Sequence, residues 1–130
     1  METIVAHEAD ALDAVSRLLT HARQAEVWPD VVRWSEAWLA IHPLAPTPWR
    51  ALLDAHEQQD APAAAAQAGQ VLLRLDPPDF VAVHFRVARA LAGENPELAR
   101  RHVLQALEEA PRFRAAFELL ASLPATSPAP

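Results

Sequence analysis

The sequence contains no cysteine, no lysine and no tyrosine, and only 2 of its 130 residues are glycine. Without cysteine there is no thiol nucleophile, disulfide bond or thiolate metal ligand. Without lysine there is neither a phosphate-loop lysine nor a Schiff base. The chain also has no run of 18 apolar residues, so we expect no membrane-spanning helix. These absences argue against several classes of enzyme and against an integral membrane protein.

The rest of the composition is acidic overall and rich in hydrophobic residues. The formal net charge is −6, which argues against a general affinity for nucleic acid or for anionic membranes. Hydrophobic residues make up 52% of the sequence, enough to form a buried core. All 11 basic residues are arginine, and alanine and proline are abundant, which favours a GC-rich bacterial genome. The first eight residues lack the pattern of a signal peptide, so we expect a cytoplasmic protein.

Apolar residues recur at spacings of three and four in seven segments, a pattern typical of amphipathic helices. Proline or an N-capping residue precedes most of these segments; Asn95 followed by Pro96 is the clearest start. Residues 42–47 contain two prolines and are predicted to form a loop, and the proline-rich residues 124–130 a tail or linker. The predicted helices cover about residues 8–24, 28–41, 48–58, 62–75, 79–91, 96–110 and 112–123.

Three prolines mark a regular period along the chain. Pro43, Pro77 and Pro111 are 34 residues apart, and each follows an apolar run. Proline just after a helix stops that helix, since it lacks an N–H and restrains the preceding residue. Pro62 and Pro96 are separated by the same interval. A period of 34 residues predicts a repeated helix–turn–helix unit.

This arrangement resembles the tetratricopeptide repeat, which has apolar, small and aromatic residues at set positions and proline at position 32. The resemblance implies an all-α fold of about seven antiparallel helices, stacked as a short right-handed superhelix (an α-solenoid). It implies one domain over residues 1–123, with repeats at about 12–45, 46–79 and 80–113 and a capping helix at 112–123. The matching residues are Leu18, Leu19 and Pro43, then Trp49, Leu52, Ala65 and Pro77, then Ala99, Ala106 and Pro111.

The first helix of the third repeat fits the signature better when it is shifted by one residue. The shift places His84, Val87, Ala88 and Leu91 at the packing positions. If the shift is wrong, Phe85 and Arg86 do not both lie in the groove, and the site prediction fails there first.

The resemblance implies a protein–protein interaction module that binds a peptide or helix of a partner in its concave groove. The guanidinium groups of arginines in that groove can donate paired hydrogen bonds to the carboxylates of an acidic partner. A competing interpretation is a solvated face of intrahelical pairs, such as Arg50 with Asp54. Some members of the family clamp a chaperone tail with lysine and asparagine, but here only Arg86 is a basic match. The predicted groove residues are Arg17, Thr20, Arg50, Asp54, Glu57, Phe85, Arg86 and Arg89.

Two tryptophans are candidate exposed anchors for a partner. Trp34 lies outside the regular core positions, and Trp28 stands at a helix start. Tryptophan is enriched at binding hot spots, although a half-buried packing role is the alternative. Trp49, at a signature packing position, is predicted to be core.

No residue pattern indicates catalysis, a cofactor or a metal. The six histidines are dispersed without a pair at i, i+4, and the resemblance makes His56 and His84 packing residues. We therefore predict a non-enzymatic protein that binds no cofactor. The alternative to a peptide-binding groove is self-association into a homo-oligomer, or service as an accessory domain of a larger bacterial enzyme or regulator.

Overall fold

The computed structural model describes the backbone of residues 2–124 and the side chains of residues 8–124. Within this part the secondary structure consists of seven α-helices and no strands, which confirms the predicted all-α class. The chain divides into two compact units, Met1–Ala61 and Pro62–Pro130, and the boundary falls between the third and fourth helices. Each unit is described by itself.

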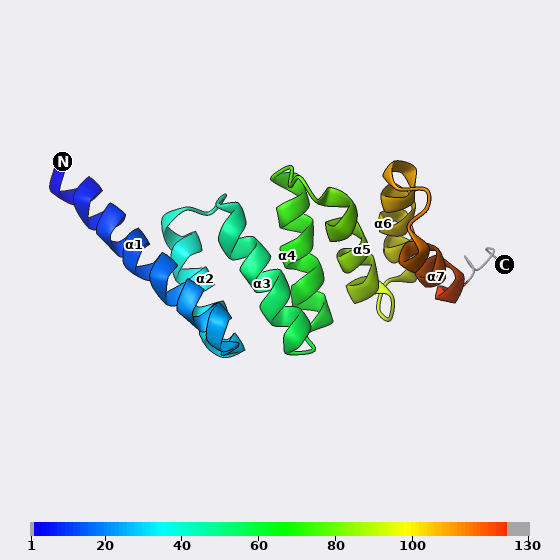
Figure 1. Cartoon of the computed structure of the whole chain (residues 1–130), viewed down its shortest axis with the longest axis horizontal. Helices are drawn as coiled ribbons and strands as arrows, with labels where there is room; N and C mark the ends of the chain where they lie inside the picture. The colour runs from blue at the N-terminus through cyan, green and yellow to red at the C-terminus, as the bar shows by residue number, and fades with distance from the viewer. Residues whose placement is uncertain (1, 125–130) are drawn as a thin grey trace. The chain divides into compact units, whose positions relative to one another are not determined.

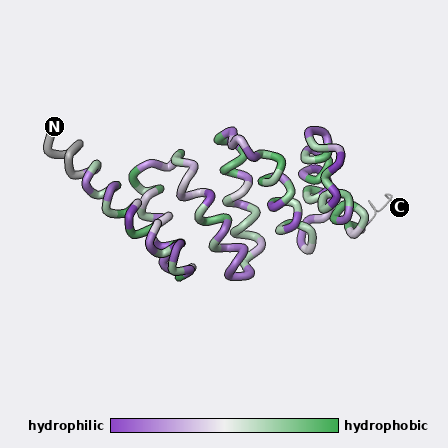
Figure 2. Tube along the Cα trace, viewed as in Figure 1, coloured by the Kyte–Doolittle hydropathy of each residue, from purple (hydrophilic) through white to green (hydrophobic). Residues whose placement is uncertain are grey.

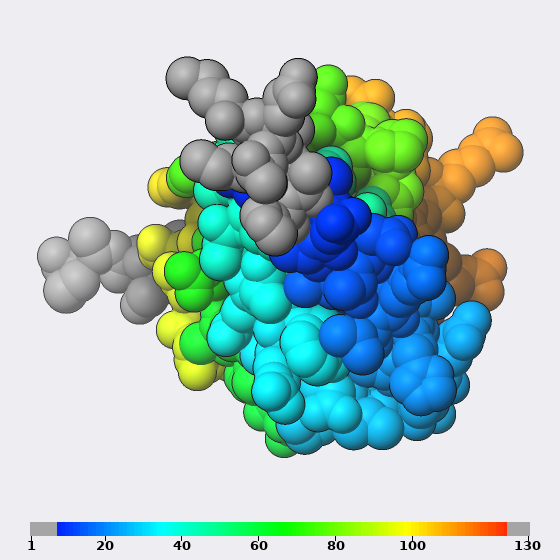
Figure 3. All heavy atoms as spheres, turned by 90° about the vertical axis from the view of Figure 1, so that its left-hand side faces the viewer, coloured from blue at the N-terminus to red at the C-terminus, as the bar shows by residue number. Residues whose placement is uncertain are grey.

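Unit 1 contains α1 (Glu2–Ala25), α2 (Trp28–Ile41) and α3 (Pro46–Gln58). Consecutive helices pack together, α1 on α2 and α2 on α3 (Figure 1). The turns that connect them contain two and four residues. In Figure 3, side chains of α1 and α2 cover the face turned toward the viewer. The buried cluster is small-residue rich, and indoles lie partly buried around it. It consists of Leu19, Ala22, Val31, Ala51 and Ala55, with Trp28, Val32, Trp34 and Trp38 against it.

Unit 2 contains α4 (Pro62–Arg74), α5 (Phe80–Leu91), α6 (Pro96–Glu109) and α7 (Arg114–Ser122), and each helix packs on the next. Hydrophobic and hydrophilic residues alternate around each helix, as Figure 2 shows. The buried residues recur at the spacing of a helix. They therefore form an apolar face on each helix, which packs against its neighbours. The fully buried residues include Leu72, Val83, Val87, Ala88, Ala99, Val103, Ala106 and Ala116.

The starts of the third and first helices differ from the prediction, whereas the start of the sixth follows its asparagine and proline signal. Asn95 caps α6, since its side chain accepts a hydrogen bond from the Leu98 N–H at 3.2 Å. The predicted loop over residues 42–47 is too long, because α3 begins at Pro46. Pro46 and Pro48 both lie in the first turn, where a missing N–H removes no intrahelical hydrogen bond. The first helix likewise begins at Glu2 instead of near residue 8, because no proline or glycine interrupts it.

Three helices are followed within two residues by a residue in the left-handed conformation, although none of these residues is glycine. Glu26, Asp60 and Asp76 have φ values of 56°, 55° and 58°. After α1, the N–H of Val27 bonds to the carbonyl of Ala22 at 3.0 Å, closing the helix end as in a Schellman motif. Tight turns between helices are therefore made here without glycine, at a cost in backbone strain.

Candidate functional site

The predicted groove residues of unit 1 lie on α1 and α3. On α1, Arg17 pairs with Asp13 at 3.1 Å, and both side chains are well exposed. Thr20 donates its hydroxyl to the Ser16 carbonyl at 2.9 Å. Both predicted residues thus interact within their own helix, as the competing interpretation of a solvated face describes, and both remain exposed to solvent.

One ion pair joins the two helices. Arg23 of α1 donates to the Asp54 carboxylate of α3, and the two side chains are 34% and 23% exposed. Arg23 stands on α1 one turn beyond the predicted Thr20 and was also expected at a groove position. The predicted Arg50, Asp54 and Glu57 on α3 are half-buried and take part in interactions. Unit 1 therefore presents a polar, internally paired face.

The predicted groove residues of unit 2 lie on α5, where they form an aromatic and cationic cluster. The Phe85 ring packs against Phe113, with the ring centroids 5.0 Å apart. The Arg89 guanidinium lies over the Phe85 ring at 5.5 Å from its centroid. Arg86, half-buried, follows on the same helix. We call these four residues the α5 cluster; Phe113, which precedes α7, is the member that the sequence pattern did not reveal.

Burial along α5 supports the predicted one-residue shift. Val87 and Ala88 are fully buried and Leu91 is 9% exposed, as the shifted register requires. Phe85 and Arg86 are half-buried and Arg89 is exposed. The helix therefore places these three side chains outside its fully buried stripe.

The tryptophans pack against the core of unit 1. Trp28 and Trp34 are half-buried, and the Arg33 guanidinium lies 4.8 Å from the Trp34 ring centroid. Trp49 is also half-buried instead of fully buried, and its indole N–H donates to the Pro43 carbonyl at 2.8 Å. Each indole thus has a structural role; contact of Trp28 or Trp34 with a partner stays a prediction.

Two histidines far apart in sequence meet in unit 2. His84 of α5 and His102 of α6 are joined by a hydrogen bond of 2.9 Å between their Nδ1 atoms. Burial lowers the pKa of both rings below the ordinary histidine value, and the charge of His84 lowers the pKa of His102 further. The packing role predicted for His84 is supported, since the Phe80 ring lies nearly perpendicular to the imidazole with the ring centroids 6.2 Å apart.

Two absences concern only the part of the chain that the structure describes. No group of three or more histidine, cysteine, aspartate or glutamate side chains there is arranged to hold a metal ion. No helix in this part is both long enough and apolar enough to cross a bilayer.

The helix order and the α5 cluster define a helical-repeat protein with an accessible polar and aromatic surface. The structure is similar to "First TPR of Spaghetti (RPAP3) bound to HSP90 peptide SRMEEVD", with a TM-score of 0.69. The two share 14% sequence identity over 86% of this chain and 89% of that chain. The likeness confirms the predicted tetratricopeptide-repeat fold. No protein-family model and no curated protein sequence matches the chain.

Proposed function

We propose that the chain is a protein–protein interaction module that binds a peptide or helix of a partner protein. The similar domain of Spaghetti (RPAP3) is bound to a peptide, SRMEEVD, which supports this use of the fold. Residues fixed by helix packing lose little conformational entropy when a partner binds, so repeat surfaces suit this role. That the repeats of both units act as one domain is part of the proposal.

The observation that carries the proposal is the α5 cluster. It combines an aromatic ring, a guanidinium stacked on that ring and a second arginine on one helix. Arginine and aromatic side chains are enriched at binding hot spots, and guanidinium forks pair with carboxylates in two-point contacts. A partner segment with acidic and apolar side chains matches this chemistry. Arg86 and Arg89 would receive its carboxylates and Phe85 its apolar side chains.

The test compares acidic and neutral peptides. The acidic probe is the heptapeptide SRMEEVD, and the control is the same peptide with its acidic side chains replaced by amides. We expect Arg86→Ala with Arg89→Ala to weaken the acidic probe by roughly tenfold or more, because charge-assisted hydrogen bonds are lost. The neutral probe should change little. The matched control carries Arg101→Ala and Arg112→Ala, two exposed arginines outside the cluster. Equal affinity of the double variant and the wild type for the acidic probe would remove the proposal.

Self-association is the second candidate. Leu104 on α6 and Phe117 on α7 are 47% and 49% exposed, and large exposed apolar side chains are suited to an interface. Light scattering of the purified chain tests it: a stable dimer supports self-association, and a monomer at micromolar concentration argues against it. A bacterial cytoplasm as the setting stays a prediction, and fractionation of the native host would test it.

A further inference from the structure

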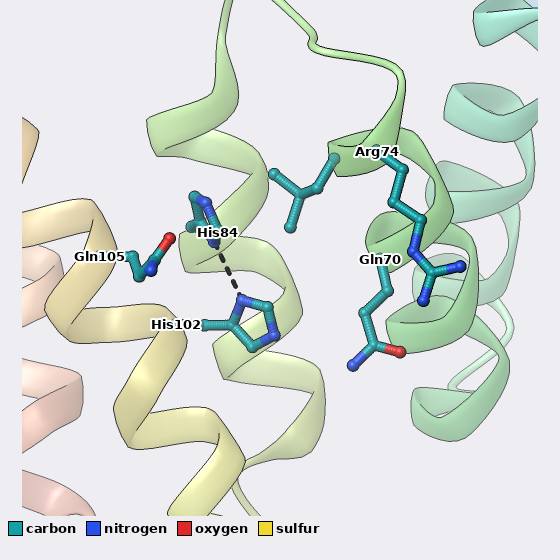
Figure 4. A pocket seen from close by; sticks show the side chains of 6 residues that line it. Gln70, Arg74, His84, His102 and Gln105 are labelled. Carbon is teal, nitrogen blue, oxygen red and sulfur yellow. Dashed lines mark hydrogen bonds between the residues drawn. The ribbon is translucent and has the colours of Figure 1, made fainter.

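Unit 2 has a second candidate site, whose lining residues do not belong to the α5 cluster. A pocket of about 480 Å³ lies among α4, α5 and α6. Figure 4 shows Gln70 and Arg74 of α4 on one side of it and the two histidines with Gln105 on the other. The volume is within the range of small-molecule pockets. The lining residues are Gln70, Leu73, Arg74, His84, His102 and Gln105.

The histidine pair has the geometry of a hydrogen bond and not of a metal chelate. The ring centroids are 5.2 Å apart, about the 2.9 Å bond plus two ring radii, so the two Nδ1 atoms point at each other. A metal bound by both atoms at about 2.0–2.1 Å would require the lone pairs to turn away from this line. In the neutral pair one ring donates through Nδ1. The other accepts there and therefore carries its hydrogen on Nε2.

The pocket is rich in hydrogen-bond donors and carries positive charge. Arg74 supplies a guanidinium, both glutamines supply amide N–H groups, and one imidazole supplies an N–H. No lining residue is a carboxylate. Among residues 8–124 no carboxylate pairs with Arg74 either. A cation would meet the arginine charge at this site, whereas an anion would meet donors from two sides.

We propose that this pocket binds a small organic anion carrying a carboxylate or phosphate group, held by Arg74 with the amide and imidazole donors around it. Guanidinium recognises both groups through paired N–H bonds. The pocket shares no lining residue with the surface proposed for peptide binding, so the chain would carry a small-molecule site in addition to a partner surface.

Calorimetric titration of the full chain with citrate, and separately with inorganic phosphate, tests the proposal. We expect saturable binding of at least one probe, and the stronger one identifies carboxylate or phosphate as the preferred group. Arg74→Gln should weaken that probe about tenfold or more, whereas the exposed-residue control Arg101→Gln should not. Arg74→Gln should also keep the affinity for the acidic heptapeptide, so failure here is distinct from failure of the peptide surface.

A second readout is the proton spectrum of the histidine rings. The bound anion should shift the signals of His84 and His102 and leave those of His21 and His42, which lie outside the pocket. No saturable binding of either anion up to about 10 mM, where affinity falls below a useful range, would overturn the proposal. Binding that Arg74→Gln leaves unchanged would also overturn it, as would saturable Ni²⁺ binding to the histidine pair in a chain that binds neither anion.

Discussion

The two units form the same kind of helical repeat from different side chains. All four tryptophans lie in residues 1–61 and all four phenylalanines in residues 62–130. Unit 1 surrounds a small-residue core with half-buried indoles and joins α1 to α3 by an ion pair. Unit 2 packs valines and alanines and joins α5 to α6 by a histidine pair. The repeat thus determines which positions are buried, but it does not determine which residue types occupy them. The two units differ in chemistry because different residue types occupy these positions.

The comparison also supplies a natural probe. Tryptophan fluorescence reports on unit 1 alone, and the pocket histidines report on unit 2 alone. These two signals therefore distinguish unfolding of unit 1 from unfolding of unit 2.

The largest effect should come from the core of unit 1. Leu19 is 2% exposed, so Leu19→Ala should lower the free energy of unfolding by about 2–5 kcal/mol through lost burial and a cavity. The neighbouring Leu18 is 41% exposed, and Leu18→Ala should cost much less. Urea unfolding followed by tryptophan fluorescence measures both. Equal losses for the two variants would mean that the register of α1 is wrong.

A smaller effect of opposite sign should come from Ser35. Its side chain is fully buried and its hydroxyl has no hydrogen-bond partner among the described residues. Ser35→Ala removes the unpaired polar group and should raise the free energy of unfolding by about 1 kcal/mol. The exposed Ser122, whose hydroxyl bonds to the Leu119 carbonyl, is the control site. Destabilisation by Ser35→Ala would show that the hydroxyl has a partner after all.

The ion pair between α1 and α3 should contribute less. Its side chains are about one-third and one-quarter exposed, so Asp54→Ala should cost about 0.5–1 kcal/mol at low salt. The exposed pair of Asp13 with Arg17 is the matched control, and Asp13→Ala should have almost no effect. Chemical unfolding at low and high salt checks both. A loss from Asp13→Ala as large as that from Asp54→Ala would contradict the distinction between the pairs.

The histidine pair should make unit 2 sensitive to acid. The pKa values of His84 and His102 are lowered in the folded state, so the unfolded chain binds more protons as pH falls. The stability from the neutral pair is present above the ordinary histidine pKa of about 6.5 and is lost as pH falls from there toward the folded values. Unfolding at pH 7.5 and 5.5 measures the loss. His84→Gln with His102→Gln should flatten it, His42→Gln should not, and an unchanged slope in the double variant would contradict this account.

Much of the fold could be predicted from the sequence because proline acts locally. Pro96 after Asn95 marks a helix start whatever surrounds it, and the period of the prolines marks the repeat. Pro46 misled the prediction, because a proline in a first helical turn and a proline in a loop look alike in sequence.

The site could be predicted only in part. The register of α5 follows from local periodicity, so Phe85, Arg86 and Arg89 could be placed outside the buried stripe. Phe113 and His102 could not be assigned to their partners, because each contact joins residues that are well separated in the sequence. Nothing in the spacing of the six histidines distinguishes a pair that meets in space from the rest.

The central claim is that the α5 cluster binds an acidic partner segment. Titrating the ¹⁵N-labelled chain with the acidic heptapeptide, and following the backbone amide signals, tests it most directly. We predict saturable shifts concentrated on residues 85–89 and on Phe113, absent with the neutral peptide and lost in the Arg86→Ala, Arg89→Ala variant. Shifts confined to residues of unit 1, or equal shifts with the neutral peptide, would contradict it.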